Sequence, residues 1–331
     1  MNSNLLNPAR RRALGAGLGG AALALLGTRA QAAAWPARPL RVLLGYTPGG
    51  AADVTAREVL TPLGRLLGQP IVIDYKPGAS GAIGAAEVMR AAPDGYTLGL
   101  LDNAPLTIVP ALRRAGYDPL ASFAPVAMVS QMPQVLVAPR SAGVATVQEL
   151  LALMRRTPGK LSYASGGSGS VGHLVAELFK SRTGTFAVHV PYRGGAPAVT
   201  ALLAGDVQFA FLTASATGPF IDSGKLKALG VSSLTRMPSL PHAPTIAESG
   251  VPGFDAPGWF ALMGPAGLPE PVAATIRKAL ADVLAAPGVA GRLEALGQTV
   301  APAGADVRRT IATEGATWKK LIDERKIAIE G

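Results

Sequence analysis

The chain has 331 residues and a mass of 33.6 kDa, enough for one large or two medium-sized domains. Hydrophobic residues make up 49%, with 40 glycines and 28 prolines, which excludes a disordered, fibrous or multi-span membrane protein. Cysteine is absent, so disulfides, iron–sulfur clusters and a cysteine nucleophile are excluded. The formal charge of +10 suggests nucleic acid, but part of it lies in an N-terminal segment that we expect to be removed.

Residues 1–34 are predicted to be a signal peptide. Arg10-Arg11-Arg12 precede an apolar stretch that runs to Leu26, and small residues favour cleavage after about Ala32 or Ala34. The stretch is rich in glycine and shorter than the ~20 residues of a membrane-spanning helix. We therefore expect export to the periplasm, by the general or the twin-arginine route, and a soluble mature protein.

The charge that remains after this segment is modest. The segment holds four of the 31 basic residues and none of the 21 acidic ones, so the rest carries a net +6. It has no run of Lys and Arg interleaved with aromatic residues, so nucleic acid is not an expected partner. A mild positive balance favours small anions, which it steers toward the surface.

From Arg38 onward, strands, loops and helices alternate about every 25 to 30 residues, as in α/β folds. Short apolar runs predict strands, and periodic apolar positions predict the helices between them. The predicted strands are 40–44, 71–73, 96–101, 161–164, 186–190, 207–212 and 226–231, and helices follow at 269–286, 288–296 and 305–325. This order indicates right-handed crossover units and mainly parallel sheets.

The two strand series predict two lobes that face each other across a cleft. We expect the chain to cross between them near Gln134–Arg140 and to return near Pro257–Met263. Lobe 1 then holds residues 35–138 and 257–331, and lobe 2 holds residues 139–256. Two crossings can act as hinges for a closing cleft.

Three glycine-rich loops, each between a predicted strand and a helix, are the candidate site. They are the first loop (Tyr46–Asp53), the second loop (Pro77–Gly84) and the third loop (Ser165–His173). Glycines let the backbone approach a ligand, and amide N–H groups at a helix start attract anions. One such loop alone is an ordinary helix cap, but three of them in both lobes favour an anion site.

Single residues in these loops allow two interpretations. Asp53 is either the N-cap of its helix or a group that orients the loop or accepts a ligand donor. Ser165, Ser168 and Ser170 can cap a helix and contact a ligand at the same time. Arg193, in Tyr192-Arg193-Gly194, is either an exposed turn residue or a bidentate partner for a carboxylate. Trp259 is interpreted as hinge packing.

An enzyme is the alternative from another functional class. Ser168 as nucleophile with His173 as base would make an exported serine hydrolase, but the chain has no Gly-x-Ser-x-Gly motif and no acid in triad order. His189 and His242 have no evident partner, and three scattered histidines make a zinc site improbable. Walker and dinucleotide motifs are absent, so no cofactor is expected.

At these residues the chain resembles the extracytoplasmic solute receptors of tripartite tricarboxylate transporters, the Bug family. The resemblance spans the mature chain in order, through Pro48–Arg57, Leu67–Ile73, Lys76–Gly84, Ala92–Leu98, Val190–Gly194, Ala201–Gly205, Gly224–Leu229, Gly258–Phe260 and Pro265–Pro269. It implies a type II periplasmic binding fold, the Venus flytrap, which holds a carboxylated ligand and delivers it to two membrane subunits. A monomer that is not an enzyme is expected.

The resemblance and the loops together give one set of candidate ligand-binding residues. They are Tyr46, Thr47, Gly49, Gly50, Asp53, Gly78, Ala79, Ser80, Gly81, Asn103, Ser165, Gly167, Ser168, Gly169, Ser170, His173, Tyr192, Arg193 and Thr213. No catalytic and no metal-binding residue is expected. The chain departs from the family pattern at Leu212, where an Asp is common, and at Asn103-Ala104, where small hydroxyl residues are common. We expect both changes to face the cleft and to favour a less polar ligand.

Overall fold

Two separate sheets organise residues 35–327, the part of the chain that this computed structural model describes. The predicted signal peptide, residues 1–34, lies outside the described residues. Residues 38–327 belong to one compact unit, and all that follows concerns this unit. Within the described residues, no helix is both long and apolar enough to cross a membrane.

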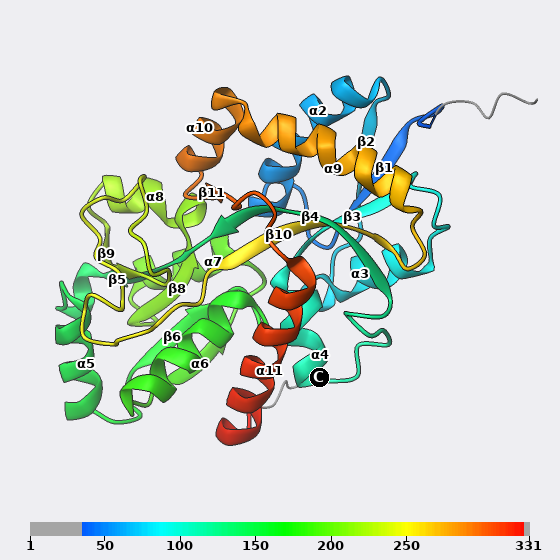
Figure 1. The fold of residues 1–331 in the computed structure, drawn as a ribbon. Helices are drawn as coiled ribbons and strands as arrows, with labels where there is room; N and C mark the ends of the chain where they lie inside the picture. The colour runs from blue at the N-terminus through cyan, green and yellow to red at the C-terminus, as the bar shows by residue number, and fades with distance from the viewer. Residues whose placement is uncertain (1–34, 328–331) are drawn as a thin grey trace, which may run out of the picture. The chain divides into compact units, whose positions relative to one another are not determined.

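The two sheets hold six and five strands (Figure 1). The first sheet has the order β11-β4-β10-β3-β1-β2, with β1 (Leu40–Leu44), β2 (Ile71–Tyr75), β3 (Thr97–Asp102), β4 (Phe123–Met132), β10 (Gly258–Pro265) and β11 (Thr299–Val300). The second sheet has the order β7-β6-β8-β5-β9, with β5 (Gln134–Pro139), β6 (Ser162–Ser165), β7 (Val188–Pro191), β8 (Phe209–Thr213) and β9 (Leu226–Val231).

Helices cover both sheets. They are α2 (Ala51–Leu67), α3 (Ala82–Arg90), α4 (Val109–Leu112), α5 (Val147–Arg156), α6 (Val171–Thr183), α7 (Gly195–Ala204), α8 (Ala214–Asp222), α9 (Glu270–Ala285), α10 (Pro287–Ala295) and α11 (Val307–Arg325). Short turns of other helix types are η1 (Ala79–Gly81), the π-helical η2 (Ala104–Ile108) and η3 (Arg140–Ala142).

The sheets are mixed, which corrects the expectation of mainly parallel sheets. The predicted crossover units are present, because β1 pairs in parallel with β2 and β3, and β6 with β7 and β8. However, β10 runs antiparallel to β3 and β4, and β5 runs antiparallel to β8 and β9. Strands that enter a sheet from the other lobe have no crossover helix, so nothing constrains them to the parallel direction.

Alternation along the strands of the second sheet buries both of its faces. Phe209 and Phe211 of β8 point into one cluster with residues of α5 and α6, while Ala210 and Leu212 point into a cluster with α7. Side chains of successive residues in a strand face opposite ways, so a strand covered on both sides is apolar throughout. This explains the continuous apolar run at 209–212.

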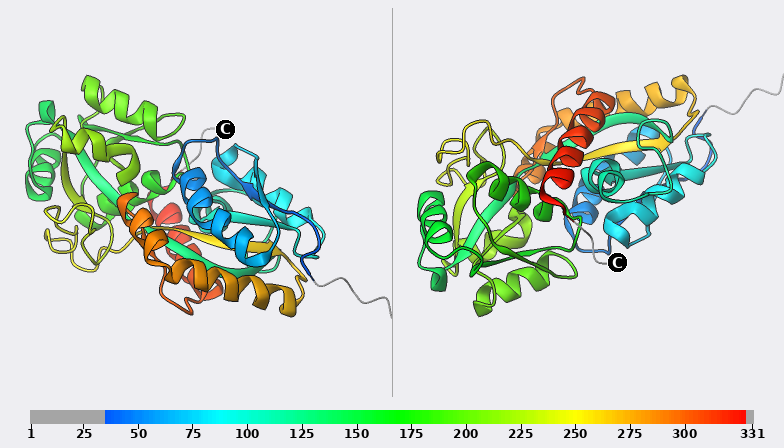
Figure 2. Two further views of the ribbon diagram at one scale, coloured as in Figure 1. Left: turned by 90° about the horizontal axis from the view of Figure 1, so that it is seen from above. Right: turned by 90° about the horizontal axis from the view of Figure 1, so that it is seen from below.

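The C-terminal helix α11 lies between the two lobes (Figures 1 and 2). It packs on η2 and α4, which belong with the first sheet, and on α6, which covers the second. Its buried Trp318, Leu321 and Ile322 join the apolar cluster of the second lobe, while Ile311 joins that of the first. The helix therefore contributes to the core on both sides.

The chain changes sheets at Pro133. Strand β4 ends at Met132 in the first sheet, and β5 begins at Gln134 in the second. Proline has no N–H group for a strand ladder, which suits a break between two strands. A boundary drawn from sheet membership therefore places β5 with the second lobe, ahead of the predicted division after Ala138.

One buried serine joins the outgoing and returning crossings. The Gln134 amide donates to Ser232 Oγ at 2.9 Å, and that hydroxyl donates to the Ala256 carbonyl at 3.0 Å. The backbone amide of Ala256 in turn donates to the Ser232 carbonyl at 2.8 Å. Ser232 has no exposed surface, so these bonds are shielded from water.

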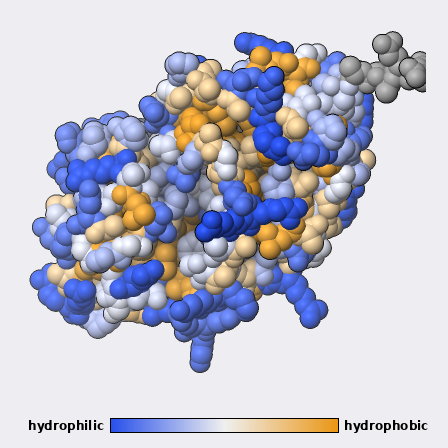
Figure 3. Space-filling view, viewed as in Figure 1, coloured by the Kyte–Doolittle hydropathy of each residue, from blue (hydrophilic) through white to orange (hydrophobic). Residues whose placement is uncertain are grey.

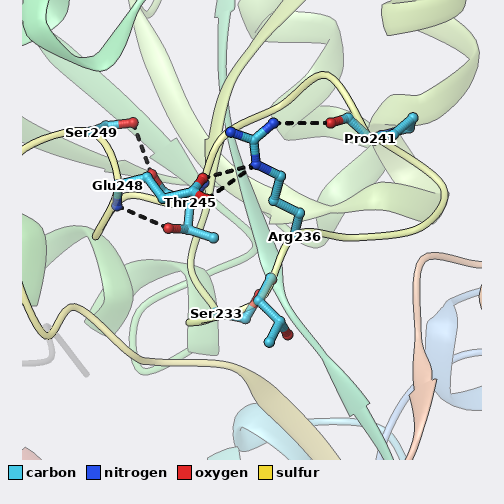
Figure 4. Close-up of polar contacts among 7 residues, drawn as sticks. Ser233, Arg236, Pro241, Thr245, Glu248 and Ser249 are labelled. Carbon is cyan, nitrogen blue, oxygen red and sulfur yellow. Dashed lines mark hydrogen bonds and ion pairs between the residues drawn. The ribbon is translucent and has the colours of Figure 1, made fainter.

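The long segment between β9 and β10 is held by its own polar contacts (Figure 4). Arg236 donates through Nε to both carboxylate oxygens of Glu248, at 2.9 and 3.3 Å, and through Nη1 to the Pro241 carbonyl. Thr245 and Glu248 exchange bonds between side chain and backbone, as in a capping box. These bonds give the segment a fixed path without regular strands.

Tight packing of α6 on β8 leads to a stability prediction. A Cβ at Gly172 would lie 2.2 Å from the Phe211 carbonyl oxygen, whereas a Cβ at Gly315 in α11 would meet nothing within 4 Å. We expect Gly172→Ala to lower the free energy of unfolding by about 2–3 kcal/mol and Gly315→Ala to raise it by about 0.5–1 kcal/mol. Urea unfolding checks both, and equal effects would contradict the close approach.

Candidate functional site

The structure brings the three glycine-rich loops together. The first loop follows β1 and the second follows β2, so both lie at one edge of the first sheet, while the third follows β6 of the second sheet. A Cβ at Gly45, at the end of β1, would lie 2.5 Å from Gly81 Cα, so only glycine permits this approach. Ser80 Oγ donates to the Ser168 carbonyl at 3.2 Å and joins the second loop to the third.

The first loop has an exposed tip and a buried base. Thr47, Gly49 and Gly50 are exposed, whereas the Tyr46 hydroxyl donates to Asp102 Oδ2 at 2.7 Å beneath the loop. Asp102 is only 6% exposed. Tyr46 therefore acts through its contact with Asp102, and the exposed residues are the part of this loop that a ligand can reach.

Asp53 is not the N-cap of α2, which corrects one of its two interpretations. Gly50 holds that position, and Asp53 lies in the first turn. Its carboxylate accepts from the Gly49 amide at 2.8 Å, from the Tyr75 hydroxyl at 2.7 Å and from Arg57 Nε at 2.8 Å. Burial raises its pKa, but these hydrogen bonds prevail and hold the pKa below its ordinary value. The other interpretation, that Asp53 orients the loop, fits these bonds.

The second loop has an unusual backbone. Gly78, Ala79, Ser80 and Gly81 all have positive φ, at 126°, 53°, 53° and 84°. Such values strain residues with a Cβ by about 1 kcal/mol or more each, and strain of this kind clusters at binding sites. Within this strained stretch, Ser80 reaches the third loop through its bond to the Ser168 carbonyl.

Amides of the third loop point in two directions. The Gly167 amide donates to Ser165 Oγ at 3.1 Å, and the Gly169 amide donates to His173 Nδ1 at 3.1 Å, so both are used within the protein. Those of Ser168, Val171 and Gly172 have no hydrogen-bond partner within residues 35–327. The amides of Gly167 and Gly169 are therefore not available to an anion in this arrangement, and the free donors are those of Ser168 and of the first two residues of α6.

Other candidate residues divide into those beside the third loop and those elsewhere. Tyr192 lies against it, because its amide donates to the Ser165 carbonyl at 3.0 Å, and the neighbouring Arg193 is exposed with no ion pair within residues 35–327. Ser170 caps α6 by accepting from the His173 amide, and Thr213 lies just before α8 at the end of β8. His173 is buried, with 3% exposed.

Two departures from the family pattern do not face an open cleft, which corrects that expectation. Asn103 has no exposed surface, and its Nδ2 donates to Glu314 Oε1 at 2.7 Å. Leu212 is 4% exposed and packs in the cluster under α7. Leu212 gains from burial of its apolar side chain, and Asn103 is held by the bond from Nδ2, although its Oδ1 is buried without a partner among the described residues. The inference of a less polar ligand loses its basis.

Relatives identify the class of protein. A model described as the tripartite tricarboxylate transporter family receptor matches residues 55–327. Protein BugT of Bordetella pertussis is 36% identical over 88% of this chain and 90% of its own length. The chain belongs to this receptor family. A protein from the tcbD–tcbE intergenic region of a Pseudomonas species is also 36% identical, over 98% of this chain and 97% of its own.

Solved structures agree with the receptor assignment. The periplasmic binding protein BugD has a TM-score of 0.79 and 31% identity, covering 89% of this chain and 100% of its own. MatC of Rhodopseudomonas palustris, solved with malate, has a TM-score of 0.78 and 30% identity, covering 87% of this chain and 100% of its own. A further R. palustris protein, solved with adipate, has a TM-score of 0.82 and 33% identity, covering 89% of this chain and 100% of its own. The two-lobed periplasmic binding fold predicted for the receptor is confirmed.

The prediction of a solute-binding receptor that works in the periplasm is confirmed by the family, and export follows from it. The serine hydrolase alternative has no support. His173 Nδ1 is occupied by the Gly169 amide, and the side chain is buried, so it is poorly placed to take a proton from Ser168. No group of three acidic or histidine side chains within the described residues could hold a metal ion.

The receptor also has a groove that lies away from the three loops. It has a volume of about 580 Å³ and is lined by β4, α9 and the segment before α11. Its two arginines, Arg277 and Arg308, donate to backbone carbonyls of Val126 and Leu120. Figure 3 shows that hydrophobic and hydrophilic residues are interspersed on the face that is viewed as in Figure 1. The groove has no convergent free polar groups among the described residues, so the loops remain the better site.

Sequence reasoning missed Glu314, which accepts from donors in three parts of the chain. Its carboxylate accepts from Asn103 Nδ2 at 2.7 Å, Trp318 Nε1 at 2.8 Å, Trp259 Nε1 at 2.5 Å and Thr107 Oγ1 at 3.3 Å. Burial raises the pKa of Glu314 and these donors oppose the rise. An acid in an amphipathic helix looks like a surface residue, so no local signal reveals it.

The Glu314 contacts predict a large effect of a small change. Glu314→Gln keeps the size of the side chain but leaves one accepting oxygen for four donors. We therefore expect the free energy of unfolding to fall by about 2–4 kcal/mol. Glu324→Gln, at an exposed position of the same helix, should change the free energy of unfolding by less than about 0.5 kcal/mol. Denaturant unfolding measures both. A Glu314→Gln receptor as stable as the Glu324→Gln receptor would contradict the role of Glu314.

Asp102 predicts a pH dependence. Burial raises its pKa to about 7, against the lowering effect of the Tyr46 hydrogen bond. Between about pH 4 and pH 7 the folded state therefore holds a proton that the unfolded state releases. This proton contributes to the free energy of unfolding, and the contribution is lost as the pH rises from about 4 to about 7. The free energy of unfolding of Asp102→Asn, relative to that of the wild type, should therefore increase by up to about 4 kcal/mol over that pH range and stay constant above it.

Unfolding by urea between pH 4 and 8 tests this difference. Tyr46→Phe is the matched control, because it removes the hydrogen bond but keeps the titrating carboxyl group. Its stability should still fall as the pH rises, and should go on falling to a higher pH than in the wild type, because the lost hydrogen bond had lowered the pKa of Asp102. A difference between Asp102→Asn and the wild type that stays constant with pH would show that Asp102 is ionised throughout.

Proposed function

We propose that this receptor binds a small organic carboxylate between its two lobes and delivers it to the membrane subunits of a tripartite tricarboxylate transporter. The observation that carries the proposal is the free amide cluster of Ser168, Val171 and Gly172, beside the Ser80–Ser168 hydrogen bond that joins the lobes. Amides at a helix start, with the positive end of the helix dipole, suit a carboxylate.

Charge and loop geometry support the same ligand class. Arg193 is exposed beside the third loop and can reach a second carboxylate group or the same one in bidentate fashion. In the exposed tip of the first loop, the amides of Thr47 and Gly50 supply further backbone donors from the other lobe, whereas the Gly49 amide is used by Asp53. Relatives of similar fold carry malate and adipate, both dicarboxylates, so a dicarboxylate is the first candidate.

The receptor's organisation follows from this proposal. Lobe 1 comprises residues 35–138 and 257–331 and lobe 2 residues 139–256, except that β5 lies between β8 and β9 in the second sheet and so belongs with lobe 2. The signal peptide is removed after about Ala32 or Ala34, and the mature receptor works as a monomer. Ligand that contacts loops of both lobes stabilises the closed form, since only that form offers all the contacts.

A binding screen tests the ligand class. Receptor from residue 35 onward, titrated calorimetrically with malate, adipate, citrate, amino acids and aromatic acids, should bind at least one carboxylate. At 100 times its dissociation constant, the ligand adds about 2.7 kcal/mol to the free energy of unfolding, which a thermal melt also reports. Absence of binding to every carboxylate, with no ligand released on denaturation, would overturn the proposal.

Val171→Pro tests the amide cluster itself. Proline fits the first position of α6, because Ser170 before it is extended at φ −72° and ψ 159°, and it removes only the amide donor and part of the side chain. We expect the dissociation constant for the bound carboxylate to rise about 10- to 100-fold, the effect of one charge-assisted hydrogen bond.

Val171→Ala is the matched control, because it shortens the same side chain but keeps the amide. Its dissociation constant should stay within about threefold of the wild type, a change well below that of one charged hydrogen bond. Equal affinity of the two variants would show that the carboxylate does not lie at the start of α6.

A further inference from the structure

Two histidines that come from different elements stack beneath the third loop. His173 lies in the first turn of α6 and His189 in β7. Their ring centroids are 3.9 Å apart with planes at 9° to each other. Tyr163 of β6 stacks on His189 at 4.9 Å, so the three rings form a continuous stack in which Tyr163 and His173 are buried and His189 is half-buried.

Each ring contacts one end of the loop. His173 Nδ1 accepts the Gly169 amide at 3.1 Å, which requires that this nitrogen carry no proton. His189 Nε2 lies 2.6 Å from Ser165 Oγ, and the same hydroxyl accepts the Gly167 amide at 3.1 Å and lies 3.0 Å from the Gly167 carbonyl. A proton on His189 Nε2 satisfies all three contacts, because Ser165 then accepts twice and donates once.

These contacts decide which amides of the loop stay free. Gly167 and Gly169 have φ of 130° and 77°, so their peptide groups adopt orientations that other residues avoid. The two imidazoles keep both amides turned into the protein. The Ser170 amide donates to the Gly167 carbonyl at 3.1 Å, so the amides of Ser168 and Val171 are left without a partner among the described residues.

We propose that His173 and His189 are positioning residues for carboxylate binding, which fix the third loop so that the amides of Ser168, Val171 and Gly172 face the anion. This inference rests on the proposed function and adds two residues to it. His173 was expected to touch the ligand, but it acts through Gly169. His189 was set aside for want of a partner, and the structure supplies two, His173 and Ser165.

Charged groups around the pair favour its neutral form. Lys180 of α6 is buried and pairs with Glu177, which also accepts the Tyr163 hydroxyl at 2.6 Å. Burial and then Lys180 lower the pKa of His173 to about 4, and burial and then His173 lower that of His189 to about 3. Glu177 opposes the shift of His189, and Arg325 of α11 acts only on Lys180. At neutral pH both rings are therefore uncharged, and His173 Nδ1 is free to accept.

Paired variants separate positioning from general stability. His173→Asn keeps an accepting atom at the place of Nδ1, whereas His173→Leu fills space without one. His189→Gln keeps a polar atom at the place of Nε2, whereas His189→Leu does not. We expect the Asn and Gln variants to bind the carboxylate found for the wild type within about fivefold, and the Leu variants to bind at least about tenfold more weakly, since each loses a buried loop contact.

Calorimetric titration gives the affinity, and thermal melts give stability in the same samples. Equal dissociation constants for the Leu and polar variants at either histidine would overturn the proposal for that residue, even if the Val171→Pro test supports the binding site. If the wild type binds no carboxylate, both proposals fail together.

Nitrogen chemical shifts of the wild type provide a test that needs no variant. In ¹⁵N-labelled receptor at pH 7, His173 should show an unprotonated Nδ1 and a protonated Nε2, and the Gly169 amide should exchange slowly with solvent. A proton on His173 Nδ1, or rapid exchange of the Gly169 amide, would overturn the proposal regardless of whether the Leu variants fold.

Discussion

The carboxylate of Glu314 fixes the frame on which the binding loops lie. It accepts from Asn103 at the end of β3, from Trp259 in the returning strand and from Trp318 in its own helix. Asn103 and Glu314 are 211 residues apart in the sequence. Because a buried carboxylate is costly unless its oxygens are satisfied, these partners have to stay together. The C-terminal helix is therefore part of the scaffold of the site, although it contributes no loop to it.

The third loop can serve as an anion site because some of its backbone amides are bonded within the protein and the others are left free. A glycine-rich loop offers several N–H groups, but an anion needs a few that point the same way. Here Ser165 and His173 occupy the amides of Gly167 and Gly169, and those at the start of α6 remain. The second loop meets it with the strained residues Ala79 and Ser80. The binding geometry thus depends on internal hydrogen bonds as much as on the donors left over.

The sequence could predict what depends on local pattern. Apolar runs located the parallel strands, and glycine clusters located the loops, because both signals lie within a few residues of each other. Contacts across long separations left no such signal. His189 looked unpaired, since its partners Ser165 and His173 follow a different strand. The mixed sheets were missed for a related reason: the strands around Pro133 pair with others far along the chain.

Ser232 gives the two crossings a common pivot. It bonds Gln134 on the outgoing path and Ala256 on the returning one, both through its single hydroxyl, and it is sealed from water. All three residues lie where the two paths enter the second lobe, so these bonds hold the paths side by side there. When the receptor opens or closes, the angle between the lobes should change while the distance between the two paths stays constant at Ser232.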